Sequence, residues 1–334
     1  MKVEHMPDTP DSDPAGTSTS AGDQLRRLLQ ASMGWPAWAT PITWIVLIGG
    51  LVLLRAGWFR NYRPRLRTEH GIELEGRPTD SMLSAVVFYR GLFEPVLTRL
   101  IEQLVQPGDL CVDAGANVGY FTLLMANRAG PEGQVLAIEA APRNLQRLQR
   151  NIARNGWADR VRVLGAAYTN APGPIAFYIS RRNDMHCRLA APPTRGFDRW
   201  LMGGARSWRV TTVPTTTLHQ ALGAGAGRVG FIKLDIEGAE HLVVQDILAH
   251  CTHPSLRVAM EAKAPHIRAA LEPFEAAGFL LYDLHNDYRW LYNRSERRAT
   301  PLAYSQAYLR RSMVDVLLSR QPLPADCLQA DPAV

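Results

Sequence analysis

The chain has 334 residues, of which 46% are hydrophobic and 20% are charged, so it is too apolar for a disordered protein. Its basic residues are almost all arginines, and a formal charge of +6 without a basic patch or motif gives no argument for nucleic-acid binding. The four cysteines form no C-x-x-C pair and are too few for a disulfide scaffold, which favours a reducing compartment.

The N-terminal part of the sequence predicts a tail followed by an apolar helix. Residues 1–36 open with a run of Pro, Asp, Ser, Thr and Gly and are predicted to be disordered. Residues 37–60 are predicted to form a transmembrane or membrane-embedded helix, with Thr40 as N-cap and Pro41 in its first turn. An interfacial helix and a cleaved signal peptide are alternatives, and the acidic tail ahead of the apolar run disfavours the signal peptide.

Arginines after the apolar segment predict its orientation. Five of them lie between residues 55 and 67, whereas the preceding tail carries three basic against five acidic residues. The positive-inside rule therefore places the C-terminal body in the cytoplasm, as a single-pass membrane protein. Residues 61–79 are predicted to be a basic juxtamembrane linker.

From about residue 80 the pattern alternates between strands and helices, which predicts a parallel sheet covered by helices. Residues 170–217 interrupt this alternation with short β-like pieces at Ile175–Ile179 and Arg209–Val213, predicted to form an insertion near the site. The predicted strands of the main sheet are Leu110–Asp113, Val135–Glu139, Val161–Ala166, Phe231–Asp235, Leu256–Glu261 and Phe279–Leu284.

The string D-A-G-A-N-V-G-Y-F at 113–121 joins an apolar strand to a helix through a glycine turn. Glycine permits unusual backbone angles at Gly115, and the N–H groups at the helix start are expected to face a ligand. Asp113 and Val118 stand where a dinucleotide fingerprint needs glycines, so a dehydrogenase is disfavoured. Glu139 ends the next strand, where an acid can accept both hydroxyls of a ribose. Together the turn and the acid predict a ribose-bearing ligand.

These strings, with I-E-A-A-P-R-N-L-Q-R-L-Q-R-N from Ile138 and F-I-K-L-D-I-E-G-A-E from Phe231, resemble the FkbM family of S-adenosylmethionine-dependent methyltransferases. The resemblance covers about residues 80–320, with 321–334 left as a C-terminal tail. It implies an α/β fold: the seven-stranded, Rossmann-like class I methyltransferase sheet with helices on both faces, preceded here by the single N-terminal transmembrane helix. The last strand, near Met313–Leu318, is expected to run antiparallel.

The implied cofactor is S-adenosyl-L-methionine, and we assign no metal ligands. Ala140 and Ala141 stand where a proline commonly follows the ribose acid in the family, which weakens any assignment to a subfamily. By matching positions, the residues implied to bind the cofactor are Asp113, Gly115, Ala116, Asn117, Gly119, Glu139 and Ala166.

Alternation along Phe231–Glu237 places Lys233, Asp235 and Glu237 on one face of an otherwise apolar strand. Buried charges are costly unless they are paired or used, and a structural Lys233–carboxylate pair is the plain alternative. A hydroxyl acceptor needs a group that removes its proton, and the candidates are Asp235 first, then Glu237 and Glu261.

We therefore expect an O-methyltransferase at the cytoplasmic membrane face, acting on a hydroxyl of a glycan, glycolipid or related small molecule. Arginines and His186 in the insertion suggest that this acceptor is anionic. The alternative is a non-catalytic membrane interaction protein that binds the cofactor without modifying a partner.

Overall fold

The computed structural model describes residues 66–76, 82–171, 173–180, 187–189, 208–286, 298–310 and 312–328. The predicted tail (1–36) and membrane helix (37–60) lie outside these residues, as does most of the arginine-rich insertion. None of the helices in the described ranges combines the length and apolar character that crossing a bilayer requires. The membrane segment stays a prediction from the sequence.

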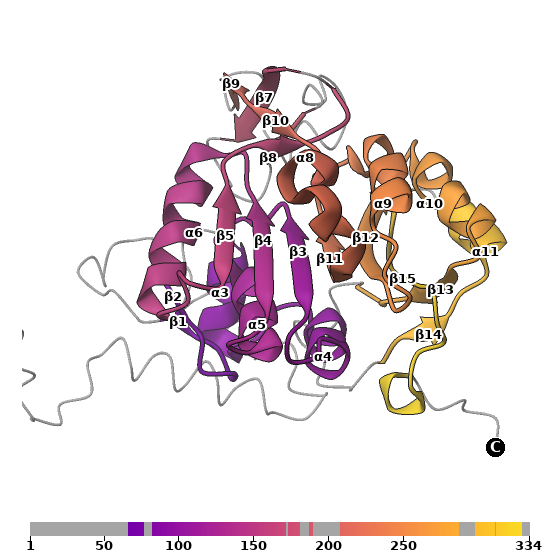
Figure 1. The fold of residues 1–334 in the computed structure, drawn as a ribbon, viewed down its shortest axis with the longest axis horizontal. Helices are drawn as coiled ribbons and strands as arrows, with labels where there is room; N and C mark the ends of the chain where they lie inside the picture. The colour runs from indigo at the N-terminus through magenta and orange to yellow at the C-terminus, as the bar shows by residue number, and fades with distance from the viewer. Residues whose placement is uncertain are drawn as a thin grey trace, which may run out of the picture.

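A sheet of eight strands forms the centre of the described part of the chain, in the order β14-β13-β15-β12-β11-β3-β4-β5 (Figure 1). The strands from β12 to β5 are parallel, and β15 runs antiparallel to both β12 and β13. Their bounds are β3 Leu110–Ala114, β4 Gln134–Ile138, β5 Val161–Leu164, β11 Val229–Leu234, β12 Arg257–Lys263, β13 Leu280–Asp283, β14 Thr300–Pro301 and β15 Met313–Ser319.

The predicted parallel strands and the antiparallel last strand are confirmed. The sheet differs from the predicted seven strands by β14, which pairs antiparallel with β13 at the edge. A two-residue strand carries no alternation pattern, so the sequence gives no signal for it.

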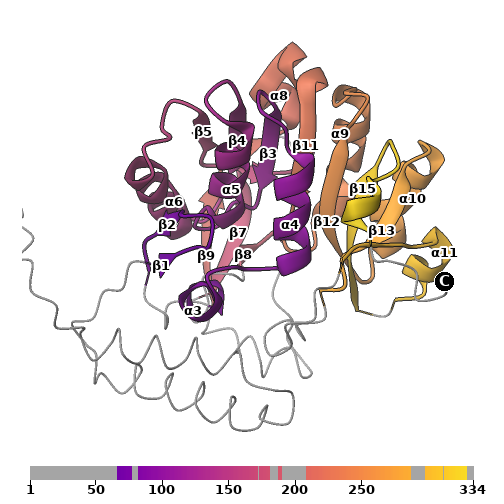
Figure 2. The same cartoon turned by 90° about the horizontal axis from the view of Figure 1, so that it is seen from below.

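Two groups of helices cover the two faces of the sheet, as Figure 2 shows. This explains why β3 and β11 are buried along their whole length and read as continuous apolar runs. One face carries α3 Met82–Arg90, α4 Pro95–Leu104, α5 Tyr120–Ala129 and α6 Pro142–Arg154. The other carries α8 Leu218–Leu222, α9 Val244–His250, α10 Ile267–Ala276 and α11 Tyr304–Tyr308, with short 3₁₀ turns η3 Gly223–Arg228 and η4 Glu240–Leu242.

Helix α4 shows how the sequence produces one of these layers. Its buried residues Leu97, Leu100, Ile101 and Leu104 recur at spacings of three and four, which makes one apolar stripe. Pro95 occupies the first turn, where a missing N–H costs nothing. The stripe lies in the same core cluster as the sheet residues on this face, so the N-terminus of α4 is held at the edge where the site lies.

The described residues of the predicted linker belong to the domain. β1 (Leu66–Arg67) and β2 (Glu73–Leu74) form a hairpin with Leu66 and Leu74 fully buried. Asn151 of α6 accepts a hydrogen bond from the Glu75 amide at 2.6 Å. Likewise, the first part of the predicted C-terminal tail folds back as η6 (Ala325–Cys327), with Leu323 and Cys327 buried. Ordered elements are therefore found on both sides of residues 80–320, and such short elements carry no periodicity by which a sequence could show them.

A second, smaller sheet lies beyond the ends of β3, β4 and β5 (Figure 1). It is formed by β7 (Ile175–Ser180), flanked by β8 (Cys187–Arg188) and β9 (Trp208–Val213), all antiparallel. The predicted strands at 175–179 and 209–213 are confirmed. We call β7, β8 and β9 the roof sheet.

Candidate active site

The glycine turn after β3 is shaped by close packing of the backbone. Gly115 has φ of 81°, and a Cβ at this position would lie 1.8 Å from the carbonyl oxygen of Asp235. At Gly119, with φ of 95°, a Cβ would lie 2.6 Å from Leu148 Cδ1 of α6. The neighbouring backbone therefore requires Gly115, whatever ligand binds, whereas at Gly119 the positive φ is the main reason for a glycine.

The amides of this turn are used internally, which differs from the expected row of N–H groups facing a ligand. The Gly115 and Ala116 amides both donate to the Ile138 carbonyl, at 2.9 and 3.1 Å. The Asn117 amide donates to Glu139 Oε2 at 2.7 Å. These bonds fix the turn against the end of β4, so its contribution to a binding site is chiefly its shape.

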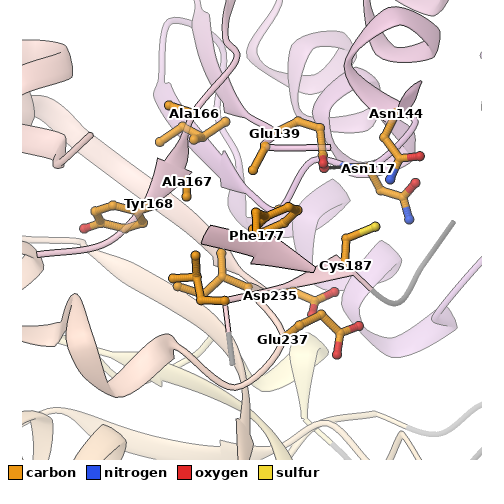
Figure 3. Close-up of a pocket in the computed structure, with 15 residues that line it drawn as sticks. Asn117, Glu139, Asn144, Ala166, Ala167, Tyr168, Phe177, Cys187, Asp235 and Glu237 are labelled. Atoms are coloured by element: carbon orange, nitrogen blue, oxygen red, sulfur yellow. Dashed lines mark hydrogen bonds between the residues drawn. The ribbon is translucent and has the colours of Figure 1, made fainter. Parts of the chain in front are cut away.

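Glu139 lies where the sequence places it, at the end of β4 and on the cavity wall (Figure 3). Its second oxygen, Oε1, accepts from the Ala141 amide at 2.7 Å. Burial raises the pKa of Glu139 to about 7, although the two backbone donors favour its charged form. A carboxylate held by two amides keeps further lone pairs free to accept ligand hydroxyls.

Lys233 of β11 lies between the carboxylates of Asp235 and Asp113. Its Nζ donates to Asp235 Oδ2 at 3.1 Å and lies 4.0 Å from Asp113 Oδ1 of the adjacent strand. Burial acts to lower the pKa of Lys233, but Asp235 and Asp113 raise it above its ordinary value. Asp113 is itself buried, which raises its pKa, and its Oδ2 accepts from Thr122 Oγ1 at 2.5 Å. The predicted structural pair is therefore present, and it holds the Asp235 carboxylate in place.

A second lysine, Lys263 at the end of β12, was not predicted as a site residue. Its Nζ lies 2.6 Å from Glu237 Oε2 and 2.7 Å from Glu261 Oε1. The signal was available, because Glu261 and Lys263 are two residues apart on a strand and so share a face. Both predicted catalytic glutamates are thus ion-paired to Lys263, whereas Asp235 pairs with Lys233.

Further carboxylates adjoin these pairs from distant parts of the chain. Asp315 of β15 is directly opposite Glu261 in the sheet register. Glu94, the N-cap of α4, has φ of 44° and interacts electrostatically with Lys233 and with Asp235. Burial raises the pKa of Glu94 to about 8 and that of Asp315 well above its ordinary value. No local pattern in the sequence points to either residue.

The last glutamate of the K-x-D-x-E-G-A-E string has a structural role. Glu240 is 2% exposed, and its Oε1 accepts from the amides of Ile236 and Gly238 at 3.0 and 3.1 Å. These two hydrogen bonds stabilise the turn at Glu237, a residue whose φ is 57°. A non-glycine residue in this region is strained, and strain of this kind clusters at functional sites.

Several of these groups line one cavity (Figure 3). Of the predicted cofactor residues, Gly115, Asn117, Glu139 and Ala166 line it, whereas Asp113, Ala116 and Gly119 do not. Asp235 and Glu237 line it as well, and Glu261 does not. The sequence missed three further residues that line the cavity: Phe177 and Cys187 of the roof sheet, and Leu189, which follows β8.

The residues fit an adenosyl cofactor. The buried carboxylate of Glu139 suits a ribose, Gly115 lines the cavity beside it, and Asn117 Oδ1 is buried with no hydrogen-bond partner within the described residues. Ala166, Ala167 and Tyr168 supply an apolar wall beyond Glu139 that suits a flat base. No group of metal ligands is formed by the described residues.

Comparisons with known proteins find methyltransferases among the proteins that are similar to this chain. The chain is 27% identical over 154 residues to methyltransferase sdnD of Sordaria araneosa, an alignment covering 41% of this chain and 59% of that protein. It is 28% identical over 107 residues to a protein-L-isoaspartate O-methyltransferase of Triticum aestivum, covering 32% and 40%. Among solved structures, Aeropyrum pernix fibrillarin with bound S-adenosyl-L-methionine aligns with 12% identity and a TM-score of 0.34, covering 75% and 80%.

The model of the methyltransferase FkbM domain matches residues 113–281. This range is half of the chain and runs from Asp113 through Glu139 to the turn at Glu237 and on to β13. The chain therefore belongs to the FkbM methyltransferase family.

Proposed function

We propose that the protein is an S-adenosylmethionine-dependent O-methyltransferase in which Asp235 accepts the proton of the acceptor hydroxyl. The observation that carries the proposal is one cavity with a ribose-type acid, Glu139, at one end and the Lys233-oriented carboxylate of Asp235 at the other. Glu139, Asn117 and the wall at Ala166–Tyr168 would hold the nucleoside. When bound, the cofactor supplies a methyl group activated by a positively charged sulfur.

The chain contributes orientation and proton transfer. Asp235 is 33% exposed and lines the cavity, so its carboxylate can contact an incoming hydroxyl. Asp235 would accept the proton of the acceptor hydroxyl as that oxygen takes the methyl group that the cofactor would supply. Such a displacement gains from a dry, orienting pocket. Lys233 is the group that keeps the carboxylate turned toward the cavity.

A substitution at Asp235 tests this role. Asp235→Asn should lower methyl transfer by about 100-fold or more while leaving S-adenosylhomocysteine affinity within about threefold, since only proton acceptance is removed. The measurements are initial rates with methyl-labelled cofactor and calorimetry with S-adenosylhomocysteine. Glu272→Gln, an exposed change on α10, is the control. Transfer by Asp235→Asn at the wild-type rate would refute the role of Asp235.

For the acceptor, we propose an uncharged hydroxyl compound such as a glycan. The two lysines near Asp235 are already paired with carboxylates, Lys233 with Asp235 and Lys263 with Glu237 and Glu261. An anionic acceptor, as the arginines of the insertion suggest, would therefore gain little from either lysine. Neutral glycosides and their phosphorylated counterparts serve as probes: we expect at least tenfold faster methylation of the neutral set, and the reverse preference would overturn the proposal.

Action at a membrane is a separate proposal that rests on residues 37–60 alone. In a full-length chain, this segment should keep the protein in the membrane pellet after carbonate washing. Replacing Val46 and Ile48 by aspartate should release it, because charges are costly in hydrocarbon. If the wild type and the aspartate variant distribute equally between pellet and supernatant, the proposal that residues 37–60 anchor the protein is refuted.

A further inference from the structure

The roof sheet is connected to the main domain at one place. Both of its connections run through β6 (Ala167–Tyr168) and β10 (Thr215–Thr216), which pair in parallel. The Ala167 amide donates to the Pro214 carbonyl at 2.9 Å and the Thr169 amide to the Thr216 carbonyl at 3.2 Å. This two-strand ladder lies directly beyond β5, at the apolar wall of the cavity, so it sets where the roof sheet sits.

The inner face of the roof sheet is apolar and turned toward the cavity. Phe177 and Val213 form a small buried cluster with Ala141 and Ala167, against which Cys187 and Leu189 also pack. This cluster is distinct from the two large ones of the main sheet. The outer face differs, since Val210 on β9 is 56% exposed. The alternation along these strands therefore directs one apolar face at the site.

Phe177, Cys187 and Leu189 line the cavity on this side. Figure 3 shows Phe177 and Cys187 beside the same cavity as Glu139 and Ala166. The register pairs Ile179 with Cys187 and Tyr178 with Arg188, which brings Leu189 across from Phe177. These side chains thus stand over the ribose acid and the wall expected to hold the base. The wall beside Glu139 includes Ala140, Ala166 and Ala167, so the lining on both sides of this end of the cavity is apolar.

The tip of the roof sheet also reaches the catalytic turn. A Cβ on Gly238 would lie 3.7 Å from the guanidinium Nη2 of Arg188. Gly238 follows Glu237, so Arg188 of β8 lies beside the turn after β11. The roof sheet therefore approaches the cavity both at Glu139, through Phe177 and Cys187, and at the turn that contains Glu237.

We propose that the roof sheet is part of the cofactor site: Phe177 and Leu189 cover the adenine, and Cys187 is shielded when the cofactor is bound. The proposal rests on the proposed cofactor and adds residues that lie outside the shared strand–turn motifs. An apolar cover over the base excludes water and adds a stacking surface. It also predicts that access to the Cys187 thiol reports directly on occupancy of the site.

Calorimetry with S-adenosylhomocysteine tests the cover. Phe177→Ala should weaken binding by about tenfold, the typical loss of one aromatic face against a base. Val210→Ala removes an exposed side chain from the same sheet on its outer face, so it controls for changes in roof-sheet stability and should bind like the wild type. Phe177→Leu, which keeps apolar area without the ring, should lose only part of the affinity.

Thiol labelling tests the shielding without any acceptor. Of the four cysteines, Cys111, Cys251 and Cys327 are buried and only Cys187 is partly exposed. N-ethylmaleimide should therefore label Cys187 first, and saturating S-adenosylhomocysteine should slow this labelling at least tenfold, whereas methionine alone should not. Cys187→Ser should abolish the fast labelling and identifies the site.

The outcomes separate the two proposals. If the wild type binds S-adenosylhomocysteine, but equally well after Phe177→Ala and with unchanged labelling of Cys187, the roof sheet has no part in the site and only this inference is overturned. If the wild type binds no S-adenosylhomocysteine, the proposed cofactor is wrong and this inference fails with it.

Discussion

The two ends of the cavity are built in different ways. The nucleoside end, around Gly115 and Glu139, is made by short-range features: a glycine turn, backbone amides and a carboxylate, all within about one strand–helix–strand unit. The end at Asp235 is made by charges on strands and helices far apart in the chain, paired through Lys233 and Lys263. The first depends on backbone shape and the second on charge balance, so substitutions should affect them differently.

The largest effect is expected where the two ends touch. Gly115→Ala adds a Cβ that would lie 1.8 Å from the Asp235 carbonyl oxygen, and it strains a residue with φ of 81°. We expect a loss of about 3 kcal/mol or more in the free energy of unfolding, from strain and overpacking together. Urea denaturation measures it.

Gly156→Ala is the matched control for that prediction. Gly156 has φ of 71°, but a Cβ there has nothing within 4 Å. The cost should be only the strain, about 1 kcal/mol. Equal destabilisation by the two substitutions would mean that the contact between the ends of β3 and β11 is unimportant.

The charged end should respond strongly to loss of a lysine. Lys263→Met leaves Glu237 and Glu261 without their partner, and these side chains are only 19% and 17% exposed. We expect a loss of about 2 kcal/mol in the free energy of unfolding at pH 8, since the pair is partly buried. Lys263→Arg keeps the charge and should cost much less.

The loss of stability caused by Lys263→Met should increase with pH. Burial raises the pKa of Glu261 in the folded protein, so an unpaired glutamate destabilises the fold as pH rises above its unfolded-state pKa of about 4.3. The difference between Lys263→Met and wild type should therefore be small near pH 4 and largest at pH 8. A difference independent of pH would show that Lys263 acts through packing alone.

The nucleoside end should show a smaller and purely local pH effect. The pKa of Glu139 is raised to about 7, so below that value the carboxyl group is increasingly protonated and accepts ribose hydroxyls poorly. S-adenosylhomocysteine affinity should be constant above about pH 8 and fall by up to about tenfold per pH unit below 7. Calorimetry over pH 6–8.5 measures this.

Glu139→Gln removes the titrating group and should flatten that profile at a lower affinity. If the wild-type and Glu139→Gln profiles run parallel, another group controls binding. Together with Lys263→Met, this separates a pH effect on ligand binding at one end from a pH effect on folding stability at the other.

The sequence by itself determined the parallel sheet, its antiparallel last strand, the glycine turn, Glu139 and the Lys233–Asp235 face. Each depends on residues close together in the chain, where alternation and turn chemistry fix which side chains share a face. The membrane segment at 37–60 is also a prediction of this kind.

Only the tertiary structure decided which charged groups surround Asp235, Glu237 and Glu261. The pairing of Glu237 and Glu261 with Lys263, the arrival of Glu94 from α4 and of Asp315 from β15, and the roof sheet over the cavity all join segments far apart in the chain. The order of strands in the sheet sets these contacts, and local patterns contain no information about that order. The structure also showed that Gly115 is required by the Asp235 backbone, because the close approach of two strand ends exists only in the folded chain.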